Sequence, residues 1–508
     1  MEKVLIDGNS LSLEQFINVV RKGYKVGLTE DAIERIERSR AIVDDLVREG
    51  KVVYGITTGF GKFSDITINK EETKALQRNL IMSHACGLGE ELDEEIVRGI
   101  ILLRINALAK GYSGVRLSTI NTLIDMLNKG VYPVIPEKGS LGASGDLAPL
   151  SHMVLVMLGE GEAYFEGELL PGKEAMDRAG IPIVELTSKE GLALINGTQV
   201  MTSIGALVVY DSLLLSKMAD VIAALTVEAL NGIVDAFDER IHKARPHQGQ
   251  IDTAKNLLKL LEGSEMISRQ GEIRVQDAYS LRCIPQVHGS SKDAIRYAKE
   301  KVDIEINSAT DNPLIFSESE SIISGGNFHG QPMALSFDFL GMALSELANI
   351  SERRLERLVN PQLSNLPAFL TREAGLNSGF MIVQYSAASL VSENKVLAHP
   401  ASVDSIPSSA NQEDHVSMGT IAARKAREIF NNTRKVLAME LLAACQAIDL
   451  RGKKKLGRGT EIAYSIFRES LSPIWEDRIM HLEISKSEEI LKSNRIIESI
   501  EAELGQLL

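Results

Sequence analysis

A glycine-rich segment near residue 140 holds the most unusual chemistry in this sequence. It reads Gly139-Ser-Leu-Gly-Ala-Ser-Gly-Asp-Leu-Ala-Pro-Leu150, and its glycines and proline favour a loop. In a tightly folded backbone, the nitrogen of Gly145 could attack the carbonyl carbon of Ala143 and close a five-membered ring. Glycine suits this step because it reaches unusual dihedral angles and leaves its nitrogen unhindered. Loss of water, including the Ser144 hydroxyl, would then leave an exocyclic methylene group, an electrophile that no ordinary side chain provides.

The same segment, extended to Ser151, resembles the signature of the aromatic amino-acid ammonia-lyases and aminomutases. Those enzymes carry 4-methylidene-imidazol-5-one (MIO), a group formed from Ala-Ser-Gly. The resemblance implies that Ala143, Ser144 and Gly145 form this group autocatalytically, with no metal and no dissociable cofactor. For an isolated Ala-Ser-Gly, the alternative is a tight turn before a helix, with Asp146 as the N-cap.

A second glycine-rich motif, Val53-Tyr-Gly-Ile-Thr-Thr-Gly-Phe-Gly61, resembles the family loop that carries the catalytic base. The resemblance gives this role to Tyr54. A phenol has an ordinary pKa of about 10, so this base needs neighbours that favour the phenolate. For the tyrosine alone, the end of a strand is the alternative. A phosphate loop is excluded, because five residues rather than four separate Gly55 from Gly61 and Phe63 replaces the required Ser or Thr.

A third motif, Val275-Gln-Asp-Ala-Tyr-Ser-Leu-Arg282, contains an arginine suited to holding a carboxylate. Gln276, Tyr279 and Arg282 follow each other at intervals that predict one helical or turn-like face. The planar guanidinium of an arginine can bond both oxygens of an α-carboxylate. The resemblance assigns this role to Arg282, and it adds Tyr279 as a catalytic residue and Gln276 as a substrate contact. A surface salt bridge is the alternative for Arg282 alone.

Two further matches supply a hydrogen-bond donor and an aromatic ring. Asn196, in Leu194-Ile-Asn-Gly-Thr-Gln199, corresponds to the asparagine that in the family hydrogen-bonds the MIO group or the bound amine. Phe328, in Gly325-Gly-Asn-Phe-His-Gly330, corresponds to an aromatic residue beside that group. Burial of Phe328 in the core is compatible with this role.

Two separate sites are expected to select the substrate. Ser83 and His84 resemble the Ser-His pair of the histidine-specific members, and Glu413 matches a glutamate typical of the same members. An imidazole has an N–H donor and a titrating nitrogen, which suit His84 and Glu413, whereas a phenyl ring would leave a buried glutamate without a partner. We therefore predict deamination of L-histidine to urocanate and ammonia. Tyrosine or phenylalanine ammonia-lyase or 2,3-aminomutase activity is the alternative.

Other classes of protein fit the sequence less well. The run Glu413-Asp414-His415 predicts no metal site, because adjacent residues of a helix point in different directions and no HExxH pair occurs. The fumarase/aspartase signature is not matched after Gly289-Ser-Ser. An inactive helical scaffold of the same fold would have no need of the site residues that the motifs contain.

The composition indicates which general class of protein this is. The 508 residues are 44% hydrophobic and 24% charged, as in an ordinary globular protein. The sequence contains no run of eighteen apolar residues, so we predict no membrane span. The net charge of −14 argues against general nucleic-acid binding, and we interpret the basic segment 451–458 as a solvated loop. Cys86, Cys283 and Cys445 are far apart and lack CxxC spacing, which indicates reduced thiols. We expect a cytoplasmic protein.

Helical patterns dominate the elements that must position these residues. A helix is predicted after Thr29, a capping candidate, and long helices are predicted over 199–232, 333–359 and 415–450, with others over 462–472 and 486–504. The stretch 219–233 is apolar on several sides, which predicts a buried helix. Strand-like runs are short, as at 51–54 and 160–165.

We therefore predict a mainly α fold, in which a loop-rich N-terminal cap of mixed structure (1–200) accompanies a bundle of long helices (201–508). The family resemblance, which runs from about Asp7 to Leu450, implies the aromatic ammonia-lyase fold and a homotetramer whose sites draw on several subunits.

Overall fold

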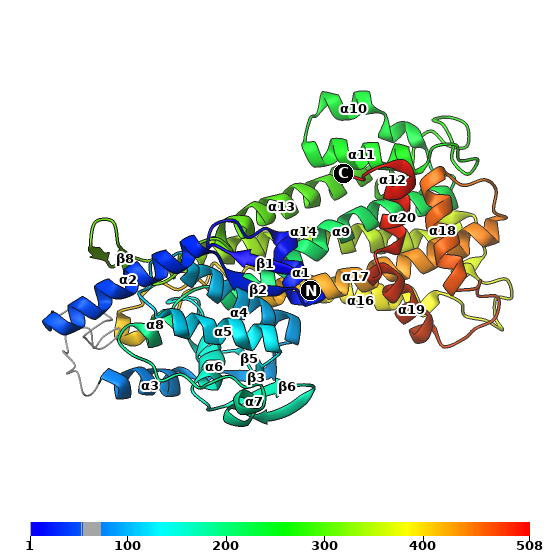
Figure 1. The fold of residues 1–508 in the computed structure, drawn as a ribbon. Coiled ribbons are helices and arrows are strands. Elements are labelled where there is room, and N and C mark those ends of the chain that lie inside the picture. The colour runs from blue at the N-terminus through cyan, green and yellow to red at the C-terminus, as the bar shows by residue number, and fades with distance from the viewer. Residues whose placement is uncertain (1, 52, 54–72) are drawn as a thin grey trace. The chain divides into compact units, whose positions relative to one another are not determined.

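The computed structural model describes residues 2–51, 53 and 73–508, which form twenty α-helices and nine short strands (Figure 1). In chain order, these are β1 (Lys3–Ile6), α1 (Leu13–Lys22), β2 (Lys25–Leu28), α2 (Glu30–Glu49), α3 (Thr73–His84), β3 (Leu88–Glu91), α4 (Glu94–Ala109), α5 (Leu117–Lys129), β4 (Tyr132–Pro133), β5 (Pro136–Lys138), α6 (Leu147–Met157), β6 (Glu162–Phe165), β7 (Glu168–Pro171), α7 (Gly172–Arg178), α8 (Glu190–Ile195), α9 (Gln199–Ala229), α10 (Glu239–Ala244), α11 (Gln248–Leu260), α12 (Tyr279–Arg282), α13 (Ile284–Glu305), β8 (Leu314–Phe316), β9 (Ser321–Ile323), α14 (Gln331–Val359), α15 (Pro361–Ser364), α16 (Met381–Leu397), α17 (Gly419–Arg451), α18 (Arg458–Ser470), α19 (Met480–Lys492) and α20 (Arg495–Leu504).

The mainly helical fold predicted from the sequence is confirmed, and the three longest helices, α9, α14 and α17, lie where the patterns placed them. Helix α2 begins as predicted, because the side chain of Thr29 accepts a hydrogen bond from the backbone N–H of Ala32 at 3.2 Å. The predicted helix over 486–504 is wrong in one respect. It is two helices, α19 and α20, because Asn494 adopts a left-handed conformation (φ +57°) between them.

Contacts within the chain divide it into two compact units, each built from three segments. The first contains residues 1–207, 299–338 and 400–424, and the second contains 208–298, 339–399 and 425–508. Helices α9, α13, α14 and α17 have residues in both units. The division at residue 200 that the sequence suggested stays a prediction.

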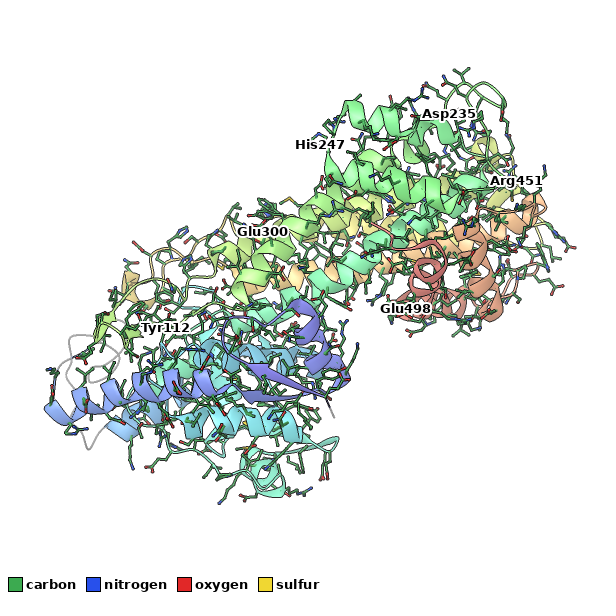
Figure 2. All side chains as sticks on the ribbon, turned by 45° about the horizontal axis from the view of Figure 1, so that its top comes forward. Tyr112, Asp235, His247, Glu300, Arg451 and Glu498 are labelled. Atoms are coloured by element: carbon green, nitrogen blue, oxygen red, sulfur yellow. The ribbon has the colours of Figure 1, made fainter. Side chains whose placement is uncertain are left out.

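The first unit combines helices with small sheets. Helix α4 is its centre: every residue from Ile96 to Ala109 is buried, and the helix packs against α1, α2 and α5. A helix with apolar residues on every side requires such a position. The strands form the parallel pair β1–β2, the antiparallel pairs β3–β5 and β8–β9, and the antiparallel sheet β4–β6–β7. The rings of Tyr112 (Figure 2) and Phe316 lie 5.5 Å apart beside the β8–β9 pair.

The second unit is helical in its described part. Residues 218–229 of α9 are all buried, which confirms the buried helix predicted there. Helices α18, α19 and α20 pack against one another, and α18 also contacts α11 (Figure 1).

The core of the second unit contains charged groups as well. The Asp220 carboxylate accepts hydrogen bonds from Lys292 Nζ (2.6 Å) and His288 Nδ1 (2.8 Å). Burial alone raises the pKa of Asp220, but the Lys292 cation and the hydrogen bond from His288 oppose it, and the pKa falls below its ordinary value. Arg354 and Glu440 form a second buried ion pair.

The basic segment 451–458, interpreted from the sequence as a solvated loop, is solvent-exposed only in part. The basic segment 451–458 is exposed from Gly452 to Lys455, but Arg451 (Figure 2) is half-buried and donates hydrogen bonds to the carbonyl oxygens of Ala229 (2.5 Å) and Ser364 (2.7 Å). Its guanidinium therefore satisfies carbonyl oxygens at the C-terminal ends of α9 and α15.

Among the described helices, α14 alone is long and apolar enough to cross a membrane, and 67% of its most apolar window is buried within the protein.

Candidate active site

The segment from Gly139 to Asp146 is a loop between β5 and α6, as the sequence predicted. Gly142 (φ +67°) and Gly145 (φ +74°) both have left-handed backbone conformations, which glycine adopts without steric cost. Gly145 pairs with Gly197 in an isolated parallel bridge, and a Cβ atom on Gly145 would collide with the Gly197 backbone. The close approach of the two backbone segments therefore requires glycine at position 145, whose nitrogen would close the ring.

Asp146 fixes this loop at its C-terminal end. It occupies the N-cap position of α6, but its side chain makes no capping hydrogen bond in that helix. Its buried carboxylate accepts instead from the backbone N–H groups of Val200 (2.9 Å) and Met201 (3.0 Å) and from the hydroxyls of Ser140 (2.8 Å) and Thr420. Asp146 thus caps α9 and joins its own loop to the first turns of α9 and α17. Burial raises the pKa of its carboxyl, and these donors oppose that effect.

Ser144 lies at the half-buried tip of the loop and has two polar partners. Its hydroxyl donates a hydrogen bond to Glu413 Oε1 at 2.8 Å. Its backbone carbonyl oxygen accepts a hydrogen bond from Asn196 Nδ2 at 2.7 Å. The neighbouring Ala143 is buried against Val416 and Met418. The structure therefore brings together three of the predicted catalytic residues, Ser144, Asn196 and Glu413.

Glu413 is held by a tight loop. The backbones of Ser408 and Glu413 exchange hydrogen bonds of 2.9 and 3.2 Å, and Ser408 Oγ donates to Glu413 Oε2 at 3.2 Å. Between them, Ser409, Ala410 and Asn411 all have positive φ angles, of 51°, 52° and 66°. Such conformations cost of order 1 kcal/mol or more for each non-glycine residue and are concentrated at functional sites.

His84 is the last residue of α3 and is half-buried. Its Nδ1 lies 3.1 Å from the hydroxyl of Ser83, which donates to the carbonyl oxygen of Leu80 at 3.1 Å. Burial lowers the pKa of His84, while the Leu80 carbonyl and the negative charge of Glu413 oppose this without reversing it. Glu413 therefore acts electrostatically on His84 and contacts Ser144 directly.

Asn196 depends on a buried arginine that the motifs did not reveal. Arg104 of α4 is fully buried and donates to the carbonyl oxygens of Asn196 and Ala193, both at 3.1 Å, and to Gln199 Oε1 at 2.5 Å. Burial lowers the pKa of Arg104 to about 10. A charged residue in the apolar run of α4 was the one sequence signal for this role.

Phe328 is half-buried in the loop before α14, and the N–H of Gly330 in that loop donates to the carbonyl oxygen of Gly142 at 3.2 Å. The loop that carries Phe328 therefore adjoins the loop that carries Ser144. A second bond to the same oxygen comes from Ser417 Oγ at 2.9 Å.

Gln276, Tyr279 and Arg282 belong to the second unit. Tyr279 and Arg282 begin and end the single-turn helix α12, and the guanidinium of Arg282 lies over the Tyr279 ring, 4.6 Å from its centre. Gln276 is exposed and precedes that helix, so the three residues share a turn only in part. Arg282 Nε is buried without a hydrogen-bond partner among the described residues, which leaves a donor for a ligand.

Tyr54, the predicted base, lies outside the described residues. Within residues 2–51, 53 and 73–508, no group of three or more histidine, cysteine, aspartate or glutamate side chains is arranged to hold a metal ion. Cys86, Cys283 and Cys445 are free thiols.

The sequence and fold are similar to those of known enzymes over their whole lengths. A profile of the family described as aromatic amino acid lyase matches residues 11–469. The histidine ammonia-lyase of Alkaliphilus oremlandii (strain OhILAs) is 68% identical over 501 residues, which are 99% of each chain.

Two solved structures have the same fold. The histidine ammonia-lyase from Trypanosoma cruzi matches with a TM-score of 0.92 at 42% identity, over 98% of this chain and 95% of that one. The tyrosine aminomutase from Streptomyces globisporus matches with a TM-score of 0.95 at 39% identity, over 100% of both chains. The fold thus occurs in a lyase and in an aminomutase, so the site must distinguish the two reactions.

Proposed function

Since the chain belongs to the aromatic amino acid lyase family, we propose that it converts L-histidine to urocanate and ammonia without oxidation. The reaction must expel an amine, which is a poor leaving group, and remove a β-proton that is barely acidic. The observation that carries the proposal is the contact of Glu413 with Ser144, together with the effect of Glu413 on His84. These interactions join Ser144, which is expected to give the electrophile, to Glu413 and His84, which are expected to select an imidazole.

The residues present fit the MIO group. Gly145 has a left-handed backbone conformation and lies against the Gly197 backbone, where only glycine fits, Asn196 donates to the oxygen that would become the ring carbonyl, and Ala143 is buried. Formed from Ala143, Ser144 and Gly145, MIO supplies the electrophilic methylene to which the substrate amine adds. We propose no metal and no dissociable cofactor.

His84 recognises the substrate side chain in this proposal. Because burial lowers its pKa, the His84 imidazole is neutral near pH 7 and has a nitrogen lone pair that accepts the N–H of the substrate ring. When the substrate imidazole is protonated, Glu413 can accept a hydrogen bond from its other ring nitrogen. The proposed selectivity for histidine over phenylalanine follows, because a phenyl ring offers neither donor.

The family resemblance supplies the remaining residues of the proposed site. Arg282 binds the substrate carboxylate, which its unpartnered Nε supports, while Gln276 and Phe328 contact the substrate. Tyr279 acts as a further catalytic residue, and Tyr54 removes the β-proton. We propose a cytoplasmic homotetramer, in line with the family resemblance, whose sites draw on several subunits.

The experiment is an assay of urocanate formation by absorbance, with parallel assays of phenylalanine and tyrosine. Turnover of histidine that disappears in Ser144→Ala, while the circular dichroism spectrum stays the same, supports the proposal. Activity with tyrosine and none with histidine would favour the alternative, a tyrosine lyase or aminomutase. Substantial turnover by Ser144→Ala would exclude an electrophile made from Ser144.

A further inference from the structure

We propose that Glu413 and Asn196 also drive the loss of water from Ser144 that completes the electrophile, before any substrate binds. This inference rests on the proposed function, because it concerns how the group is made at the same site. It gives Glu413 a role in maturation in addition to its proposed contact with the substrate.

The contacts of Ser144 are those that elimination of its hydroxyl needs. The leaving oxygen, Oγ, lies 2.8 Å from Glu413 Oε1, within the range for direct proton transfer. The carbonyl oxygen next to the reacting Cα accepts from Asn196 Nδ2 at 2.7 Å. A donor at this position stabilises negative charge on the oxygen and so makes the Cα proton more acidic. One side chain thus serves the leaving group, and the other serves the carbanion.

The segment that follows Glu413 also contacts the loop that carries Ser144. Met418 N–H donates to the carbonyl oxygen of Leu141 at 2.8 Å, and Ser417 Oγ donates to that of Gly142 at 2.9 Å. Ser408 Oγ holds the second carboxylate oxygen. The carboxylate is therefore fixed relative to Ser144 by contacts on both sides of it, as a proton-transfer group should be.

Ring closure joins the Gly145 nitrogen to the Ala143 carbonyl carbon, and the Ala143 oxygen leaves as a first water with the protons of the Gly145 and Ser144 N–H groups. For the second water, the Cα–H bond of Ser144 breaks and its electron pair moves onto the Ser144 carbonyl oxygen, where Asn196 stabilises the charge. That pair then forms the Cα=Cβ bond as Cβ–Oγ breaks. The Cα proton reaches the Glu413 carboxylate through solvent water, and Glu413 then passes a proton to the departing Oγ, which leaves as the second water, so that Glu413 ends as the carboxylate it was at the start.

A merely structural role for the Ser144–Glu413 hydrogen bond makes a different prediction. If the bond only holds the loop, its loss changes stability but leaves the chemical state of Ser144 unaltered. If Glu413 transfers the proton, its replacement should give chains in which the ring has closed while the Ser144 hydroxyl is retained. Intact mass separates the two, because each completed step removes the mass of one water.

The test compares intact masses of purified full-length proteins, with the modification located by mass analysis of the proteolytic peptide that contains residues 143–145. The wild-type chain is expected to be two waters lighter than its sequence, and Ser144→Ala marks the one-water species. Because a positioned acid or base contributes about 10²–10⁴-fold to a rate, we expect most Glu413→Gln chains to keep the second water. Asp414→Asn, which changes the adjacent exposed carboxylate, should lose both waters.

Each outcome decides the inference. A complete two-water loss in a folded Glu413→Gln would overturn it and leave the proposed function intact. A wild-type chain of unmodified mass would overturn the MIO proposal and this inference with it. If Glu413→Gln does not fold, Glu413→Asp keeps the charge at a greater distance from Oγ and should accumulate the one-water species during synthesis; complete loss of both waters there would count against the inference.

Discussion

Asp146 Oδ2 accepts a hydrogen bond from the backbone N–H of Met201 at 3.0 Å and so ties the Ser144 loop to the first turn of α9. The first N–H groups of a helix have no partner within the helix, and the positive end of its dipole attracts an anion. The side chain at the start of one helix therefore caps another. This arrangement holds the reactive loop without using any atom that the ring closure needs.

Replacement of Asp146 by alanine should destabilise the protein, because it leaves buried N–H and hydroxyl donors without an acceptor. We expect a loss of about 3 kcal/mol in the free energy of unfolding, given the cost of unsatisfied buried groups. Asp146→Asn keeps one acceptor oxygen and should lose less. Urea denaturation followed by circular dichroism measures both. Asp404→Ala removes an exposed carboxylate and is the control; equal denaturation midpoints for Asp146→Ala and the control would contradict the anchoring role.

His84→Leu should weaken the use of histidine by roughly tenfold in kcat/KM, the value of about one hydrogen bond to the substrate ring. His481→Leu, in α19 of the second unit, is the matched control. The pH dependence adds a second readout. Burial places the pKa of His84 below its ordinary value of 6.5, so protonation and the rise in KM should appear only as the pH falls below that value. A KM that rises already between pH 8 and 7 would argue against His84 as the neutral acceptor.

The sequence predicted the long helices well because their composition has few breakers. Helix α9 was expected over 199–232 and extends over Gln199–Ala229, since Asn231 has a positive φ angle of 46° and Gly232 follows it. The separation of α19 from α20 was missed, because the left-handed conformation of Asn494 depends on how the two helices pack.

The candidate site was predictable as a set of residues but not as a set of contacts. Motifs identified Ser144, Asn196 and Glu413, yet the bonds that join them span 52 and 269 positions of the chain. Such pairings arise from long-range packing, which local patterns do not contain. The same reason hid Arg104 and Ser408, which belong to no motif and act by holding other site residues.

Glu228 should make stability depend on pH. Burial raises the pKa of this carboxyl to about 6, and hydrogen bonds from Ser264, Thr460 and the Gly457 N–H oppose it only in part. Between pH 4.5 and about 6, the unfolded chain loses a proton that the folded chain keeps, so the free energy of unfolding falls as the pH rises, by about 2 kcal/mol in all. Glu228→Gln removes this term and should raise the thermal midpoint at pH 8 but not at pH 4.

The matched control for Glu228 is Glu498→Gln, which changes an exposed carboxylate of α20 (Figure 2). Its thermal midpoint should follow that of the wild type at both pH values. A Glu228→Gln midpoint that also follows the wild type at pH 8 would show that the buried carboxylate carries no penalty.

The buried pair of Arg354 and Glu440 predicts strongly non-additive substitutions. Arg354 Nε and Nη2 donate to the two carboxylate oxygens at 2.5 and 2.9 Å, and the hydroxyls of Ser351 and Thr226 donate to the same carboxylate at 2.6 and 2.8 Å. Both charged side chains are fully buried. Arg354→Met should cost about 3–5 kcal/mol, because it leaves the Glu440 charge buried without its cation. The double variant Arg354→Met/Glu440→Met removes both charges and should be more stable than Arg354→Met alone. Thermal and urea midpoints of the wild type, both single variants and the double variant form the cycle. Additive losses would show that the two side chains contribute independently and would refute a coupled pair.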